Sequence, residues 1–201
     1  MKRQNARKSF TLLELLIVIA IAVIIAGGLV PLFGVTKKDA KIAKLLALID
    51  ALKDASMRYY FDTGEYAIEF GNFGESCPQT HRKLSCDPGV SGWQGPYISR
   101  PLMEEDNPLG VGTPFESSFY LHDLVQTDFD FDGDGSVDRR AMTAGNSISF
   151  DVDSEATGKK IDDMLDKGIG GSNWQSSGKV QYWVLGGESW IFIYVLGGET
   201  N

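Results

Sequence analysis

Residues 8–31 read KSFTLLELLIVIAIAVIIAGGLVP, and this stretch decides the fold of the N-terminal part of the chain. No charged residue occurs between positions 15 and 36, and residues 15–26 are almost purely aliphatic. As a helix, such a run is long enough to cross the hydrocarbon core of a bilayer, which is roughly 30 Å thick. The stretch therefore predicts a transmembrane segment over about residues 13–33.

The residues before this run are strongly basic. Lys2, Arg3, Arg7 and Lys8 lie among the first nine residues, which contain no acid. Basic residues beside a transmembrane segment tend to stay in the cytoplasm, which favours an extracytoplasmic position for the rest of the chain. Further lysines follow the apolar run and make this charge difference modest. A secretory signal peptide would have a shorter apolar region that ends at a small-residue cleavage site. A plain signal anchor remains an open alternative.

The helical pattern continues beyond the apolar run. Leucine and isoleucine recur at steps of three and four residues, with charged residues between them, at Ile42, Leu45, Leu46, Ile49 and Leu52. This spacing is typical of an amphipathic helix that packs on a soluble core. We expect one long helix over residues 10–62, with bending at Gly27, Gly28 and Pro31.

Residues 63–201 have a different composition, rich in Gly, Pro, Asn and aromatic residues, which predicts a globular β-rich head. Residues 71–112 are expected to be mostly loop. Residues 180–185 and 190–196 form the best hairpin candidate, joined by a turn at residues 186–189. The predicted fold class is α+β: a long N-terminal helix packed on a small antiparallel sheet.

Net charge narrows the class of partner. The chain carries 27 acidic and 19 basic residues, for a formal charge of −8, and four of the basic residues lie in the short leader. Binding to a phosphate backbone depends on clustered Lys and Arg. Nucleic acid is therefore not expected as a partner of the head.

The segment KSFTLLE, residues 8–14, resembles the cleavage and methylation signature of type IV prepilins and of type II secretion pseudopilins. The resemblance implies a prepilin peptidase that cuts between Ser9 and Phe10 and methylates the new amino terminus at Phe10. Residues 1–9 would be the cleaved leader, with Ser9 where the family prefers glycine. It also implies a kink at Pro31, since proline removes a helical hydrogen bond.

The resemblance also assigns a role to Glu14, the fifth residue of the mature chain. A carboxylate at the head of an apolar span is disfavoured unless it lies at the interface or meets a partner. In a filament, the amine of Phe10 of one subunit would neutralise Glu14 of its neighbour. The alternative is a Glu14 side chain that reaches the water at the membrane edge.

Residues 93–98 (WQGPYI) and 106–110 (DNPLG) look like the W-x-GPY and DP-x-G stretch of major pseudopilins, with Asn107 interrupting the usual Asp-Pro. The alternative is a generic aromatic turn cluster. The resemblance implies a bacterial inner-membrane protein with an extracytoplasmic head, which joins a periplasmic or cell-surface helical filament. Its implied partners are further copies, other pseudopilins and an inner-membrane assembly platform. Alternatives are a major or minor pilin, and a calcium-binding anchored adhesin or sensor that does not polymerise.

Cys77 and Cys86 are the only cysteines. Outside the cytoplasm their simple interpretation is a disulfide that closes a short loop, and two free buried thiols are the alternative.

Residues 128–141 contain DFDGDGSVD, which fits the first nine positions of an EF-hand-type calcium loop. Gly135 permits the sharp turn, Val137 is expected to anchor the loop to the core, and Ala141 stands where an EF-hand has a glutamate. A solvated acidic loop is the alternative. The predicted calcium ligands are Asp130, Asp132, Asp134, Ser136 and Asp138, with Asp128, Asp151 or Asp153 as possible additions.

Signatures of catalysis are missing from the sequence: there is no GxSxG, HExxH, GxGxxG or Walker loop. The only histidines, His81 and His122, have no neighbouring nucleophile in sequence. We therefore expect a structural subunit and no enzyme. The acidic residues Asp162, Asp163 and Asp166 are interpreted as the solvated surface of a helix or turn.

Overall fold

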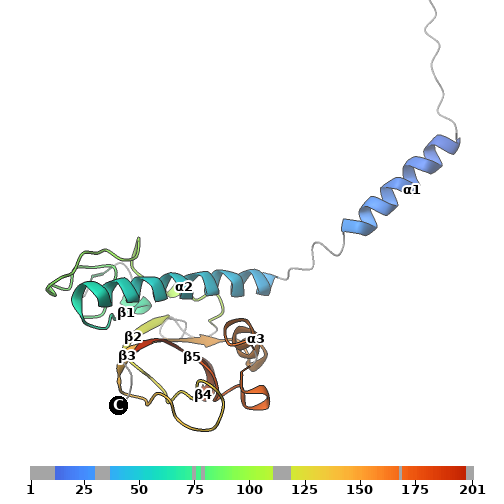
Figure 1. Cartoon of the computed structure of the whole chain (residues 1–201). Helices are drawn as coiled ribbons and strands as arrows, with labels where there is room; N and C mark the ends of the chain where they lie inside the picture. Colours follow the sequence, from blue (N-terminus) through green and yellow to red (C-terminus); the bar gives the residue numbers. More distant parts are fainter. Residues whose placement is uncertain are drawn as a thin grey trace, which may run out of the picture. The chain divides into compact units, whose positions relative to one another are not determined.

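The computed structural model describes residues 12–29, 37–73, 76–77, 80–110, 119–167 and 169–197. The chain divides into two compact units, residues 1–40 and 41–201, and each is described by itself. The predicted α+β class is confirmed: the described residues contain three α-helices and one five-stranded antiparallel sheet (Figure 1).

Helix α1 (Leu12–Leu29) belongs to the first unit. Its sequence is aliphatic apart from Glu14 in the first turn and two glycines near the end. Apolar side chains half or more exposed occur on all sides of the helix and do not form one stripe: Leu12, Leu13, Leu15, Leu16, Ile17, Val18, Ile19, Ile21 and Val23. Such a helix is apolar all round and needs an apolar environment on every side.

Within the part of the chain that the structure describes, no helix has the length and apolar character needed to cross a membrane.

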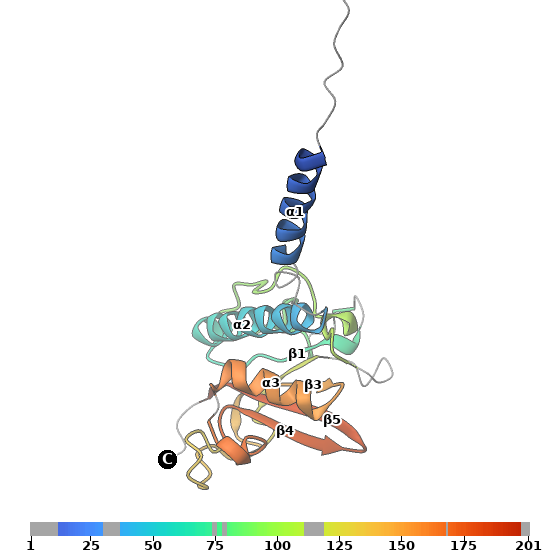
Figure 2. The ribbon, with the colours of Figure 1, turned by 90° about the vertical axis from the view of Figure 1, so that its right-hand side faces the viewer.

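Helix α2 (Lys37–Thr63) covers the sheet of the second unit (Figure 2). The apolar residues that the sequence spaces at three- and four-residue steps form the buried face of α2. The described residues leave a gap at 30–36, so the expected continuity of the helix from residue 10 to 62 and the kink at Pro31 lie outside the described residues. The fully or almost fully buried residues of α2 are Ile42, Leu45, Ile49, Leu52, Ala55, Ser56 and Tyr59.

The sheet has the strand order β1-β2-β3-β5-β4, with every neighbouring pair antiparallel. Side chains alternate between the two faces of a strand, and one face joins α2 in the core through residues such as Ile148, Phe150 and Ile191. The strands are β1 (Glu69–Phe70), β2 (Tyr120–Leu124), β3 (Ala144–Val152), β4 (Val180–Leu185) and β5 (Glu188–Gly197).

The predicted hairpin is present as β4 and β5, and β5 begins at Glu188, two residues before the predicted start. Gly186 and Gly187 form the turn with φ values of 63° and 93°, a conformation that a two-residue hairpin turn requires and that glycine adopts without strain. The expectation that residues 71–112 are mostly loop also holds for their described part, where only two 3₁₀ turns occur, Gly71–Phe73 and Glu104–Asp106.

Helix α3 (Glu155–Leu165) packs on the sheet near β4, and the Ser154 side chain caps its N-terminus by accepting a hydrogen bond from the Thr157 amide. The interpretation of the acidic residues of this region as a solvated surface is wrong for Asp162 and Asp166, which are buried. Ile161 must face the core, and one turn of helix brings Asp162 and Asp166 to the same covered side. Only Asp163 is half exposed.

Candidate functional site: the N-terminal motif and the head elements that accompany it

Glu14 lies in the first turn of α1, with aliphatic side chains before and after it. The amides at the start of a helix lack partners within the helix and carry partial positive charge, so a carboxylate is favoured there over the middle of the helix. The predicted cleavage residues Ser9 and Phe10, and Pro31, lie outside the described residues.

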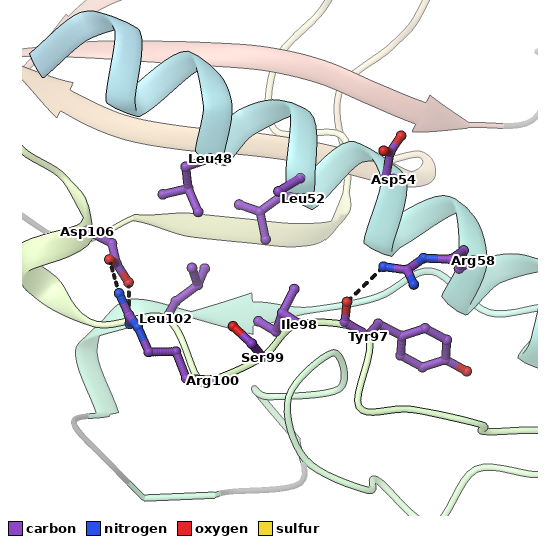
Figure 3. Close-up of a pocket in the computed structure, with 11 residues that line it drawn as sticks. Leu48, Leu52, Asp54, Arg58, Tyr97, Ile98, Ser99, Arg100, Leu102 and Asp106 are labelled. Carbon is purple, nitrogen blue, oxygen red and sulfur yellow. Dashed lines mark hydrogen bonds and ion pairs between the residues drawn. The ribbon is translucent and has the colours of Figure 1, made fainter. Parts of the chain in front are cut away.

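The segment from Trp93 to Tyr97 packs on α2. The ring of Tyr97 meets the ring of Tyr59 edge-on at 5.6 Å between centroids, and its hydroxyl donates to Asp62 at 2.8 Å. Arg58 donates to the Tyr97 carbonyl at 2.9 Å, as Figure 3 shows. Three contacts with one face of a helix fix this aromatic turn against the core.

Residues 100–109 continue this layer. Arg100 forms a two-pronged ion pair with the buried Asp106, with distances of 2.9 Å and 2.5 Å (Figure 3). Asn107, the residue that departs from the family's Asp-Pro, donates from its buried amide to Asp151 of β3 and accepts from the Leu109 amide at 3.1 Å. No local pattern predicts the contact with Asp151, because the two residues are far apart in the chain.

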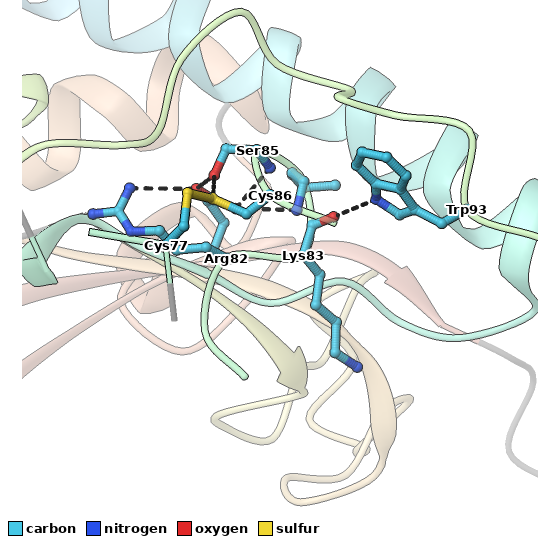
Figure 4. Close-up of a disulfide and its surroundings, with 8 residues drawn as sticks. Cys77, Arg82, Lys83, Ser85, Cys86 and Trp93 are labelled. Carbon is cyan, nitrogen blue, oxygen red and sulfur yellow. Dashed lines mark hydrogen bonds and ion pairs between the residues drawn. A yellow bond between two sulfur atoms is a disulfide. The ribbon is translucent and has the colours of Figure 1, made fainter. Parts of the chain in front are cut away.

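Cys77 and Cys86 form a disulfide, as predicted (Figure 4). The Trp93 indole nitrogen donates to the Lys83 carbonyl at 3.0 Å, so the disulfide loop also holds the aromatic turn (Figure 4).

Sequence reasoning missed the buried carboxylate that ties this loop to the sheet. Glu69 of β1 accepts hydrogen bonds from the Leu84 amide at 3.0 Å and from the Ser85 hydroxyl at 2.6 Å. Burial raises the pKa of Glu69, and burial lowers the pKa of the adjacent Arg82 guanidinium, 3.7 Å away. The signal in the sequence is weak, since an acid in a two-residue strand resembles any exposed acid.

The acidic loop is organised by hydrogen bonds from its own backbone. Asp130 accepts from the amides of Gly133 and Gly135, each at 2.8 Å, and Gly135 has a φ of 89°, as its place at the sharp turn requires. Asp138 accepts from the Phe131 amide at 2.7 Å. These contacts fix the turns of the loop, while the side chains of Asp132, Asp134 and Asp138 stay exposed.

Carboxylate oxygens of Asp130, Asp132 and Asp138 lie within 4.8 Å of one another. These are the first, third and ninth positions of the predicted calcium loop, and hard oxygen ligands of this kind suit Ca²⁺. A carboxylate has about four lone-pair sites, so Asp130 retains acceptor capacity beside its two amide contacts. The three residues offer three of the roughly six to eight oxygen ligands that Ca²⁺ takes.

The other predicted ligands are not in this group of three. The Asp134 carboxylate accepts from the Ser136 amide at 2.7 Å, and the Asp128 carboxylate accepts from the Ala141 amide at 2.6 Å. Asp151 accepts from Asn107. Asp153 accepts from Ser154 and Thr157 at the start of α3. Ser136, expected to offer its main-chain oxygen, donates its amide to Asp134.

The expectation that Val137 anchors the loop is wrong, because its side chain is 45% exposed. Aromatic residues take this role: Phe129 is fully buried, and Tyr194 of β5 lies 5.7 Å from the Phe129 ring and 4.8 Å from the Phe131 ring. The loop thus rests on the sheet face that α2 does not cover.

The two histidines have different surroundings. His81 lies inside the disulfide loop, beside Thr80 and between the rings of Phe70 and Phe73. The His122 Nε2 atom lies 2.8 Å from the Ser149 hydroxyl. The sequence does not predict this contact, because the two residues are far apart in the chain. Burial lowers the pKa of His122 to about 4, so its ring is neutral at pH 7.

Residues 4–30 match a protein-family model, the prokaryotic N-terminal methylation motif. The chain carries the signature of type IV pilins and pseudopilins. No curated protein and no solved structure matches the chain. The pilin motif supports a structural subunit of the pilin-like or pseudopilin class, and it implies inner-membrane anchoring, processing by prepilin peptidase and assembly with other pilins.

Proposed function

We propose that the chain is a subunit of a type IV pilus-like filament, and specifically a major-type pseudopilin of a type II secretion system. The observation that carries the proposal is the methylation motif at residues 4–30, in which Glu14 is the acid in the first turn of an aliphatic helix. The subunit is anchored in the inner membrane by about residues 13–33. Prepilin peptidase then cuts between Ser9 and Phe10.

Assembly follows from the apolar surface of α1. Leaving lipid for a bundle of identical helices conserves the burial of aliphatic side chains, so hydrophobicity alone gives little specificity. The methylated amine of Phe10 supplies the specificity of assembly. It neutralises Glu14 of a neighbouring subunit, and this pairing fixes the axial register.

The choice of a pseudopilin over a pilus subunit rests on the segment of residues 93–110. That segment resembles the major pseudopilins in sequence, and in the structure Tyr97 contacts α2 while Asp106 and Asn107 join it to Arg100 and β3. These contacts hold the segment against α2 and β3.

A second candidate is a membrane-anchored calcium-binding adhesin or sensor that does not polymerise. The convergence of Asp130, Asp132 and Asp138 favours calcium in either case. In the pseudopilin, the ion would stabilise the head by neutralising three carboxylates, and it would take no part in a reaction. Millimolar extracellular calcium fills even weak sites of this type.

A deletion strain in the native host tests the function. A pseudopilin predicts loss of protein secretion, with the cargo retained in the periplasm, while motility and surface pili stay normal. Loss of pili with normal secretion would assign the chain to a pilus. Normal secretion together with normal pili would contradict both filament assignments and favour the anchored adhesin or sensor.

A further inference from the structure

The sheet face that α2 leaves uncovered carries a groove of about 340 Å³ near its centre. It follows a row of directly opposed residues, one from each strand of the sheet, and all of them except Gln181 line it. The row runs in the order Phe70, Tyr120, Ser149, Phe192 and Gln181.

Side-chain size explains the hollow. Ser149 is the small member of the row, between the larger rings of Tyr120 and Phe192. Trp190 lies two residues before Phe192 on the same face of β5, with its ring centroid 6.5 Å from that of Tyr120. Neighbouring side chains on one sheet face stand side by side, so a serine among aromatic residues leaves a depression with flat apolar walls.

The groove also offers neutral polar groups. The Ser149 hydroxyl and the His122 ring form its floor, and the Gln126 side chain lines its edge. No residue that lines it carries a formal charge at pH 7, because the His122 ring is neutral at that pH. This contrasts with the acidic chain as a whole, whose formal charge is −8.

The aromatic walls and the neutral hydrogen-bonding groups favour a ligand that has both apolar faces and uncharged polar groups. The Ser149 hydroxyl and the His122 Nε2 atom pair with each other, and both groups keep further hydrogen-bonding capacity that a purely apolar ligand would cover without using. An anionic ligand would meet an acidic protein without a lysine or arginine in the groove. An added polypeptide strand needs a free strand edge, whereas β2, β3 and β5 are paired on both sides.

A pyranose ring meets both requirements, because it presents C–H groups on its faces and hydroxyl groups around its rim. We propose that this groove binds an uncharged saccharide, with a sugar face on Trp190 or Tyr120 and sugar hydroxyls on Ser149, His122 and Gln126. The site belongs to the head alone, so the inference does not depend on filament assembly.

The test is calorimetric titration of the full-length protein in lauryldimethylamine oxide, a detergent without a sugar headgroup. The probes are maltohexaose, cellohexaose and chitohexaose, with hexagalacturonate as an anionic sugar of similar size. We expect at least one neutral hexasaccharide to bind with a Kd of about 1 mM or tighter, and hexagalacturonate to bind at least about tenfold more weakly.

Two variants locate the site. Ser149→Val removes the hydroxyl and retains a β-branched residue suited to a strand, and Gln126→Ala changes a partly exposed side chain at the groove edge. Each is expected to weaken binding about tenfold, the change that one lost hydrogen bond of about 1.4 kcal/mol produces. Phe61→Ala, which removes an exposed aromatic ring from α2, is the control and is expected to bind as the wild type does.

Thermal unfolding of each variant checks its fold, and Gln126→Ala tests the site even if Ser149→Val does not fold. The proposal is overturned if no neutral hexasaccharide binds at about 10 mM. It is equally overturned if hexagalacturonate binds as tightly as the neutral sugars, or if folded Gln126→Ala binds them as the wild type does.

Discussion

The side-chain amide of Asn107 donates to the Asp151 carboxylate at 2.8 Å and to the Asp151 main-chain oxygen at 3.0 Å. Both residues are buried, so this pair joins the loop that follows Glu104–Asp106 to the sheet without contact with water. An aspartate at position 107 would replace this amide donor and bring a second carboxylate to Asp151.

Removing this amide is expected to destabilise the head. In Asn107→Ala, the Asp151 carboxylate loses a buried donor, which costs about 1–3 kcal/mol. Asn107→Asp is expected to cost at least as much at pH 7, because two buried carboxylates then repel. Chemical denaturation measures both effects, with the exposed Gln94→Ala of the same loop layer as a control. Equal stability of Asn107→Ala and the wild type would refute a stabilising role for the contact.

Asp162 predicts a pH dependence of stability. Burial, and then the nearby charge of Asp166, raise the pKa of Asp162 from 3.8 to about 6, and its Oδ1 atom has no hydrogen-bond partner. A pKa that is higher in the folded state favours the protonated form there, so this stabilisation is complete below pH 3.8 and is lost as the pH rises through about 6.

Asp162→Asn keeps the shape of the protonated acid and does not ionise. We expect the variant to gain on the order of 1 kcal/mol over the wild type between pH 4 and pH 7, measured by thermal unfolding across that range. Asp163→Asn is the matched control, since Asp163 pairs with the same Lys159 but is half exposed. A difference between Asp162→Asn and the wild type that does not change with pH would count against this account.

The calcium proposal predicts a stabilisation that depends on three carboxylates. Calcium is expected to raise the Tm of the wild-type head and to leave the double variant Asp132→Ala, Asp138→Ala unchanged, because only Asp130 of the group remains. The double variant Asp50→Ala, Asp54→Ala is the control, since it removes two exposed carboxylates from α2. The same Tm of the wild type in calcium and in chelator would rule out the ion site.

Glu14→Ala tests the register of assembly. We expect the variant to enter the membrane fraction as the wild type does, since it removes only a charge from an apolar helix. Filament yield should fall at least about tenfold, because the amine of Phe10 loses its counter-ion and is left unpaired in a protein core. Leu16→Ala, a truncation nearby on the same helix, serves as the control. Wild-type filament yield from Glu14→Ala would refute the charge pairing.

The features that the sequence predicted well depend on local patterns. The burial of Ile42, Leu45 and Ile49 follows from the helical repeat alone, and the hairpin of β4 and β5 follows from two β-prone runs around a glycine pair. Local patterning constrains such elements because each one buries a single face.

The features that it missed depend on contacts between distant residues. Asp162 looked solvated in a run of charged residues, and only the packing of α3 on the sheet shows that it is covered. The groove around Ser149 requires the strand register, since residues from all five strands line it. Val137, the anchor that the EF-hand pattern predicts for the acidic loop, is exposed. Phe129 and Phe131 anchor the loop instead, because both rings pack on Tyr194 of β5.

The most direct test of the central claim is the intact mass of the protein purified from the membranes of its native host. We predict a chain that begins at Phe10 with a methyl group on its amino nitrogen, and fragmentation that places this group on the first residue. A mature protein that still begins at Met1 would contradict processing by prepilin peptidase and, with it, the assignment to a pilin-like filament.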